Sequence, residues 1–143
     1  MQKQKLKQSI LVVDDYDEFR KLLRIRLEQR GYLVLEAADG QEAVEVAERE
    51  LPDLILMDFN LPILDGFIAT QYIRQLDTLR NIPIVGVTAH GKEYSQSVAL
   101  AAGCNDYLEK PLDFEDLYLV INRWLSKQSN QQADSRSNGK EDH

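Results

Sequence analysis

The sequence predicts a doubly wound α/β fold in which five parallel strands alternate with five helices. Short apolar runs alternate five times with stretches of helical periodicity along the 143 residues. The runs are apolar throughout, which is typical of strands buried on both faces of a parallel sheet. Because a helix follows each strand, right-handed crossovers place the helices on both sides of one open sheet.

Three of the predicted strands and two of the helices lie in the first half of the chain. The runs SILVVD, YLVLEA and PDLILMD are predicted as strands. A helix is expected from about residue 17 to 30, with Gly31 as its stop signal. Its predicted buried stripe consists of Phe19, Leu22, Leu23 and Leu27. The segment DGQEAVEVAERE is predicted as the second helix, with its inward residues at Ala43, Val44 and Ala47.

The second half continues the same alternation. Helical patterns are expected in DGFIATQYIRQL, KEYSQSVALAAG and DFEDLYLVINRWL, and strands in IPIVGVTA and DYLEK. The third helix is expected to bury Phe67, Ile68, Tyr72 and Ile73. The fifth is expected to bury Phe114, Leu117, Val120, Ile121 and Trp124.

The chain is expected to hold one folded domain with two extensions. Residues 1–8 form a basic N-terminal extension with three lysines, and residues 9–126 form the domain. Residues 127–143 are polar, lack aromatic side chains and show no hydrophobic period, so we predict that they are disordered.

Charge and composition exclude several classes of protein. The net charge is −7; the lysines of residues 1–8 contribute +3 and residues 127–143 are balanced, so residues 9–126 carry −10. An acidic domain repels nucleic acid, and direct nucleic-acid binding is not expected. The apolar runs are too short for membrane insertion, and no secretory signal is visible. The single cysteine, Cys104, reads as a small packed residue and fits a reducing cytoplasm.

Polar residues follow four of the five predicted strands. In an open parallel sheet the functional groups gather outside the carboxyl ends of the strands. Those ends carry the pair Asp14 and Asp15, then Asp58, Thr88 and Lys110, whereas the second strand supplies Glu36. The polar residues of strands one, three, four and five are therefore expected to project from one edge.

Each of these residues also has an ordinary structural interpretation. Asp14 or Asp15 could be an N-cap, Asp58 could open a turn, and Lys110 could be a solvated charge before a proline. Together they indicate more, because three neighbouring carboxylates repel one another unless a cation lies among them. Oxygen ligands suit Mg²⁺, and a lysine and a hydroxyl nearby suit the oxygens of a phosphoryl group.

The segments VVDD, MDFNLPILDG, VTA and LEKP, in this order, resemble the receiver domain of two-component response regulators. The resemblance covers about residues 8 to 126. It implies the flavodoxin-like strand order 2-1-3-4-5, which is the order of the chemotaxis regulator of that family.

The resemblance also implies a role for each site residue. Asp58 matches the phosphate-accepting aspartate, Asp15 the direct Mg²⁺ ligand, and Asp14 the acid that holds the metal through water. Asn60 matches the residue whose backbone carbonyl completes the coordination. The remaining matches are Thr88 as the switch hydroxyl, Lys110 as the phosphate-binding lysine and Tyr107 as the aromatic switch residue.

The function implied is that of a signalling domain that catalyses only its own modification. Asp58 would accept a phosphoryl group from a histidine kinase or a histidine phosphotransfer domain, with Mg²⁺, and would slowly lose it to water. Movement of Thr88 and Tyr107 would then change the face made by the fourth helix, fifth strand and fifth helix, which an unknown downstream protein reads. Lys110–Pro111 matches a peptide bond that is usually cis in the family.

Four further features have open interpretations. We favour a capping role for Asp65 and a structural role for Gly66. His90 would lie at the rim of the site. The first helix carries five basic residues and an apolar residue, Ile25, off its buried stripe, so it is either a solvated face or the surface that docks the phosphoryl donor.

Three other functions compete with this one. A metal-dependent phosphatase similar to the haloacid dehalogenase group would need an acid two residues after the nucleophile, where this chain has Asn60. A non-catalytic scaffold of the same fold would not need the acids, the threonine and the lysine together. A flavodoxin-like electron carrier would need a phosphate-cradling loop after the first strand, and the sequence has none there.

Overall fold

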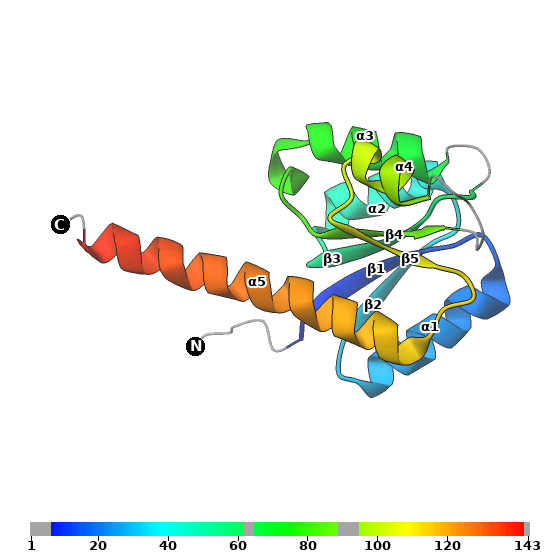
Figure 1. The fold of residues 1–143 in the computed structure, drawn as a ribbon, viewed down its shortest axis with the longest axis horizontal. Helices are drawn as coiled ribbons and strands as arrows, with labels where there is room; N and C mark the ends of the chain where they lie inside the picture. Colours follow the sequence, from blue (N-terminus) through cyan, green and yellow to red (C-terminus); the bar gives the residue numbers. More distant parts are fainter. Residues whose placement is uncertain (1–6, 62–64, 89–94, 142–143) are drawn as a thin grey trace. The chain divides into compact units, whose positions relative to one another are not determined.

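A computed structural model describes residues 7–61, 65–88 and 95–141, with side chains placed up to Lys127 except at Ser95 and Gln96. The chain divides into two compact units, Met1–Pro111 and Leu112–His143. Figure 1 shows the elements in chain order. In the first unit they are β1 (Ser9–Val13), α1 (Asp17–Gln29), β2 (Leu33–Ala37), α2 (Gly40–Glu50), β3 (Leu54–Asp58), α3 (Gly66–Gln75), a short 3-10 helix η1 (Asp77–Leu79), β4 (Ile84–Thr88), α4 (Ser95–Ala102) and β5 (Asp106–Glu109). The second unit holds α5 (Phe114–Glu141).

The five strands form one parallel sheet in the order β2-β1-β3-β4-β5, which confirms the predicted fold class and strand order. The three inner strands β1, β3 and β4 are buried along their whole length. Buried parallel strands need apolar side chains on both faces, which explains the continuous apolar runs.

Helices cover both faces of this sheet. In Figure 1, α2, α3 and α4 lie along one face and α1 lies along the other. The core cluster on the α2–α4 face takes alternate strand residues such as Leu11, Ile55 and Ile84. Their neighbours in sequence, for example Ile10 and Val12, are equally buried and point to the opposite face, since strand side chains alternate.

The helices bury narrower stripes than their apolar residues suggest. In α1, Leu23 and Leu27 are buried, whereas Leu22 is 40% exposed and its predicted burial is wrong. In α3 the buried residues are Gly66, Ala69, Thr70 and Ile73, and the predicted burial of Ile68 and Tyr72 is wrong. Small side chains at 66, 69 and 70 permit a close approach of the helix to its neighbours, so the larger apolar residues are left on the outer side.

The helix starts agree with ordinary capping chemistry. The carboxylate of Asp65 accepts a hydrogen bond from the Ile68 N–H at 2.9 Å, which confirms the predicted capping role. Asp39 caps α2 in the same way through the Glu42 N–H at 2.8 Å. The N-cap of α1 is Tyr16, so neither Asp14 nor Asp15 has that role.

The second unit is a single helix with a buried apolar stripe. Leu117, Val120, Ile121 and Leu125 are buried, while Phe114 and Trp124 are partly exposed. Residues 127–143 are predicted to be disordered, whereas the described part of that segment, residues 127–141, is helical because α5 continues to Glu141. This stretch has no proline and contains several residues with good helix propensity, so the backbone hydrogen bonds can continue past the apolar stripe. The proposed boundary between domain and tail at residue 126 stays a prediction.

Across the described ranges, none of the helices combines the length and the apolar character that a membrane span requires.

Candidate functional site

Three carboxylates meet at the carboxyl edge of the sheet. Asp14 follows the last residue of β1, Asp58 is the last residue of β3, and Asp15 is next to Asp14 in the chain. One carboxylate oxygen from each lies within 4.8 Å of the other two. Asp14 and Asp58 are each 2% exposed, whereas Asp15 is exposed to solvent. The cluster therefore combines two buried acids with one that solvent reaches.

The backbone fixes Asp58 from both sides. Its carboxylate accepts a hydrogen bond from the Asn60 N–H at 2.9 Å, and the next peptide N–H, that of Phe59, donates to Val87 of β4 at 2.9 Å. Gly66, the first residue of α3, lies against the Asp58 carbonyl, and a Cβ at Gly66 would overlap that oxygen. The predicted structural role of Gly66 is thus specific: it allows α3 to begin directly behind Asp58.

Asp14 is held by its own main chain and by the turn that follows. Its N–H donates to the carbonyl of Ala37 at 3.1 Å, which extends the pairing of β1 with β2 by one residue. Its carboxylate accepts the N–H of Tyr16 at 2.9 Å. Because the turn after β1 closes on the acid itself, Asp14 points back into the site instead of capping α1.

Lys110 brings a positive charge to two of these acids. Its Nζ lies 3.1 Å from Asp58 Oδ2 and 3.4 Å from Asp14 Oδ2. Its side chain is 34% exposed, and Nζ also lies 5.8 Å from the centre of the Phe19 ring on α1. The cluster therefore holds three carboxylates and one ammonium group, and its net charge is about −2 when all four groups are ionised.

The pKa values of the buried groups reflect this imbalance. Burial raises the pKa of Asp58, and the opposing effects of the Asn60 N–H and of Lys110 do not cancel it. Burial lowers the pKa of Lys110, but the charges of Asp58 and Asp14 outweigh this effect and the net shift is upward. An additional cation among the acids would stabilise their ionised forms. The donor set, three carboxylates with one open to water, fits a hard divalent ion such as Mg²⁺.

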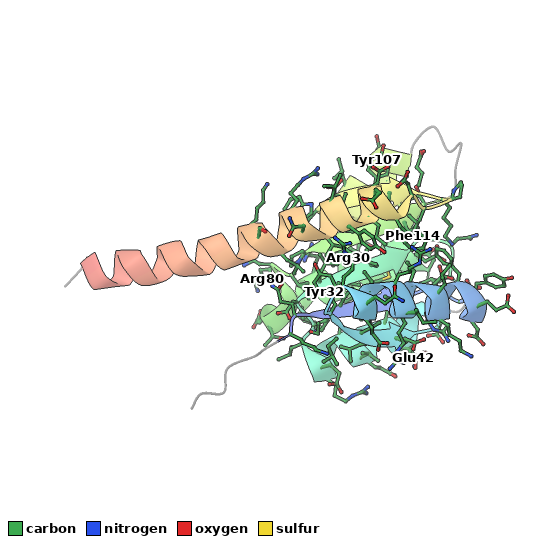
Figure 2. The ribbon with its side chains drawn as sticks, turned by 90° about the horizontal axis from the view of Figure 1, so that it is seen from below. Arg30, Tyr32, Glu42, Arg80, Tyr107 and Phe114 are labelled. Carbon is green, nitrogen blue, oxygen red and sulfur yellow. The ribbon has the colours of Figure 1, made fainter. Side chains whose placement is uncertain are left out.

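Thr88 and Tyr107 lie on the two neighbouring strands. Thr88 ends β4, is buried, and donates its hydroxyl to the Leu108 carbonyl at a long 3.5 Å. The Lys110 N–H donates to the Thr88 carbonyl at 2.8 Å, which joins the ends of β4 and β5. Tyr107, labelled in Figure 2, pairs with Gly86 and packs, partly buried, against the core cluster. The weak hydrogen bond leaves the Thr88 hydroxyl available to a better acceptor.

The other residues singled out in the sequence lie around this site or in the core. Asn60 is exposed next to Asp58, and its N–H is the donor already described. His90 lies outside the described residues. Cys104 is buried, and burial raises the pKa of its thiol to about 12, which agrees with a packed residue. The Lys110–Pro111 peptide bond is cis.

Two residues of α1 contact the site and were not selected from the sequence as site residues. Phe19 was assigned to the buried stripe, although its ring lies near Lys110. Arg20 is one of the five basic residues of the first helix, and its guanidinium donates to the Asp14 carbonyl at 2.7 Å. Both lie in the first turn of the helix that follows Asp15, and this position is the signal that could have identified them.

Residues 10–122 match the family described as the response regulator receiver domain. The polar-differentiation response regulator DivK of Brucella anthropi is 33% identical over 117 residues, covering 82% of this chain and 95% of DivK. The CAI-1 autoinducer sensor kinase/phosphatase CqsS of Vibrio cholerae is 36% identical over 126 residues. That match covers 87% of this chain but only 18% of CqsS.

A comparison with solved structures indicates the same family. The receiver domain of the sensor histidine kinase PA1611 from Pseudomonas aeruginosa, with a magnesium ion coordinated in its active-site cleft, has a TM-score of 0.78 and 40% sequence identity. That likeness covers 84% of this chain and 98% of the Pseudomonas chain. A shared fold, a family match over most of the chain and an acidic cluster at the carboxyl edge of the sheet agree with one another. The chain belongs to the response regulator receiver domain family of two-component systems.

Proposed function

We propose that Asp58 is the phosphoryl acceptor of this receiver domain. The observation that carries the proposal is a buried carboxylate at the end of a central strand, 3.1 Å from Lys110 and next to two further acids. A nucleophile on a rigid strand, with positive charge placed beside it, is the arrangement that phosphoryl transfer requires.

The reaction would be an in-line transfer from a phosphohistidine. An ionised Asp58 oxygen attacks phosphorus, the new O–P bond forms as the P–N bond breaks, and the imidazole leaves with the electron pair and takes up a proton. Lys110 pairs with the oxygens of the transferred group, because its ammonium already lies beside Asp58. Water later attacks the acyl phosphate, which returns Asp58 and releases inorganic phosphate.

The proposed metal ligands are Asp14, Asp15, Asp58 and the backbone carbonyl of Asn60. Bound Mg²⁺ would supply positive charge that offsets the negative charge of the transferring group. We assign Asp15 as the direct ligand and Asp14 as the acid that acts through water. In support, Asp15 is exposed, whereas the Asp14 carboxylate is already shared between Tyr16 N–H and Lys110. The magnesium ion in the PA1611 receiver domain supports the choice of metal.

We propose Thr88 and Tyr107 as the switch that reports phosphorylation. A phosphoryl oxygen on Asp58 is a stronger acceptor than the Leu108 carbonyl, which the Thr88 hydroxyl contacts only at 3.5 Å. Movement of Thr88 toward the phosphoryl group would open space beside Gly86, the residue that pairs with Tyr107. The Tyr107 ring can then turn inward and change the surface that a downstream protein contacts.

The proposed phosphoryl donor is a histidine kinase or a histidine phosphotransfer domain, and we place the transfer in the cytoplasm. The names of CqsS and PA1611 as sensor kinases support a donor of this class. We propose that it docks on α1, where Ile25 is 53% exposed and Leu22 is 40% exposed among basic residues.

The assignment of Asp58 is tested by phosphorylation with acetyl phosphate and Mg²⁺, followed by mass spectrometry of the intact protein and of its peptides. One phosphoryl group is expected, on the peptide that contains Asp58, and none in Asp58→Asn. Asp77→Asn, which changes an exposed acid in η1 far along the chain, is the matched control and should be labelled like the wild type. Full labelling of Asp58→Asn would overturn the assignment.

The metal assignment is tested by calorimetric titration of Mg²⁺. Asp15→Ala should abolish measurable binding, whereas Asp14→Ala should weaken it by about 10- to 100-fold, as is usual for a group that holds a metal indirectly. Equal losses in the two variants would refute the distinction between direct and indirect ligand.

A further inference from the structure

Arg20 joins three segments of the chain around the acid pair. Its Nη1 donates to the backbone carbonyl of Asp14 at 2.7 Å, its Nε to Glu36 at 2.8 Å and its Nη2 to Asp17 at 2.7 Å. The first segment follows β1, the second belongs to β2 and the third begins α1. The Arg20 side chain is only 13% exposed, and its contacts with the Asp14 carbonyl and with Glu36 are partly buried, whereas its contact with Asp17 is open to solvent.

The contact with Asp14 acts on the peptide that joins the two acids. The Asp14 carbonyl belongs to the same planar group as the Asp15 N–H, so its direction fixes the orientation of the whole peptide. The N–H of Asp14 is held by Ala37 and its carboxylate by Tyr16. The carbonyl is held by Arg20, a side chain that a substitution can change without altering the backbone.

We propose that Arg20 is a positioning residue for the metal site, which sets the relative directions of the Asp14 and Asp15 side chains by holding the peptide between them. The proposal rests on the function proposed for the acid cluster. A guanidinium is suited to this task because its donors lie on three nitrogens held in one rigid plane, whereas the three donors of an ammonium lie on a single nitrogen at the end of a flexible stem.

Electrostatics alone predict the opposite effect. Arg20 carries a positive charge near the site, and removing it would make the surroundings of the acids more negative and would favour a divalent cation. A loss of Mg²⁺ affinity on removing Arg20 would therefore arise from position and not from charge. The sign of the change separates the two explanations.

Arg24 provides a matched control. It lies one turn further along α1 and contacts the other oxygen of the same glutamate, Glu36, at 2.6 Å. It also pairs with Glu28 at 3.0 Å, and its side chain is 47% exposed. Substitution of Arg24 removes the same charge from the same helix and the same partner, while the hydrogen bond to the Asp14 carbonyl, which comes from Arg20, is kept.

The experiment is a calorimetric titration of Mg²⁺ into the full chain carrying Arg20→Lys, Arg20→Gln or Arg24→Gln. Each is measured well below its melting temperature as found by circular dichroism. Arg20→Lys and Arg20→Gln should both weaken Mg²⁺ binding by about 10-fold, the size usual for groups that orient metal ligands. Arg24→Gln should stay within about twofold of the wild type.

A second measurement separates a positioning role from a general loss of structure. Phosphorylation of Asp58 by acetyl phosphate is followed as a function of Mg²⁺ concentration. In Arg20→Lys the concentration for half-maximal rate should rise about 10-fold, while the rate at saturating Mg²⁺ approaches that of the wild type. A variant damaged in its fold would lose the saturating rate as well.

Arg20→Lys is the decisive variant, because it keeps the charge and is the least disruptive to folding. Wild-type affinity in Arg20→Lys would overturn the proposal, since the guanidinium geometry would then be unnecessary for Mg²⁺ binding. Tighter binding in Arg20→Gln would overturn it too. If the wild type itself neither binds Mg²⁺ nor is phosphorylated at Asp58, the proposed function of the site is wrong. If the wild type binds Mg²⁺ and the Arg20 variants bind it equally well, only the role proposed for Arg20 is wrong.

Discussion

Two clusters of charged and polar groups, each at least partly buried, lie at opposite edges of the same sheet, and their charges are balanced differently. At the carboxyl edge, Asp14 and Asp58 share Lys110, and the exposed Asp15 lies beside them. At the amino edge, the guanidinium of Arg74 from α3 is surrounded by neutral acceptors near the starts of β4 and β5.

Arg74 is satisfied almost entirely by the backbone. It donates to the carbonyls of Gly103 at 2.8 Å and Ile82 at 2.6 Å, and to the side-chain oxygen of Asn105 at 2.7 Å. Burial lowers its pKa, although an arginine stays charged throughout the accessible pH range. These acceptors belong to two connections of the fold, Ile82 to the one before β4 and Gly103 and Asn105 to the one before β5, so Arg74 has permanent partners that no ligand needs to supply.

The acid cluster has no such balance. Its described partners are one lysine and two backbone N–H groups, and burial still raises the pKa of Asp58. Burial of charge is therefore not by itself a mark of function. The site is distinguished by a charge that its own partners leave uncompensated, which an added cation can relieve.

The largest effect is expected at the amino edge. Arg74→Ala should lower the free energy of unfolding by about 3 kcal/mol, because three partly buried acceptors lose a charged donor. Denaturant unfolding with and without Mg²⁺ measures this loss of free energy, and the loss should be the same under the two conditions. Arg80→Ala, which removes an exposed arginine paired with Asp77, is the control and should change stability by less than about 0.5 kcal/mol. A loss that Mg²⁺ repairs would show that the two edges are coupled and do not act independently.

A smaller effect of opposite sign is expected at the carboxyl edge. Without metal, Asp58→Asn should be more stable than the wild type at neutral pH by about 1 kcal/mol, since it removes one of the repelling carboxylates. The variant should gain less from Mg²⁺ than the wild type, which gains about 1.4 to 2 kcal/mol at ten- to thirtyfold excess over Kd. Thermal melts with and without Mg²⁺ provide both numbers. A metal-free variant that melts below the wild type would mean that favourable hydrogen bonds dominate at Asp58.

The stabilities of the wild type and of Asp58→Asn should also depend differently on pH. Because the pKa of Asp58 is raised in the folded state, the folded chain keeps this proton to a higher pH than the unfolded chain. The stabilisation that comes from protonated Asp58 is complete below the ordinary pKa of the unfolded chain, and it is lost as pH rises through the raised pKa of the folded chain. Metal-free wild type should therefore lose stability relative to Asp58→Asn as pH increases from about 3.8 upward. Parallel stability curves across this range would contradict the raised pKa.

The smallest effect is expected from removal of the C-terminal part of α5. A chain ending after Ser126 keeps the whole apolar stripe and loses the contact of Lys127 with the Trp124 ring at 4.5 Å. The free energy of unfolding should change by less than about 0.5 kcal/mol, and Asp58 should still be labelled by acetyl phosphate. A large fall in melting temperature would show that residues 127–141 contribute to stability, and it would move the domain boundary proposed at residue 126.

Local sequence patterns were sufficient to predict the alternation of five strands and five helices and the residues at the strand ends. Continuous apolar runs are a local signal, and so is a carboxylate that follows such a run, as at Asp58. The capping role of Asp65 is also local, since its partner is the N–H three residues later. Parallel strands then oblige their carboxyl ends to share one edge, which is why Asp14, Asp58 and Lys110 can be grouped from the order of the strands.

Tertiary packing determines which side of each helix is buried and which distant groups touch. Ile68 and Tyr72 have apolar side chains at helical spacing, yet the close approach allowed by Ala69 and Thr70 turns them outward. The position of Arg20 in the first turn after Asp15 indicates that it lies near the site, but its contact with the Asp14 carbonyl depends on how α1 is placed over the end of β1. The physical reason is the same in both cases. The exposure of a side chain and the partner of a charged group are determined by packing between segments, and the sequence of one segment does not specify which other segments pack against it.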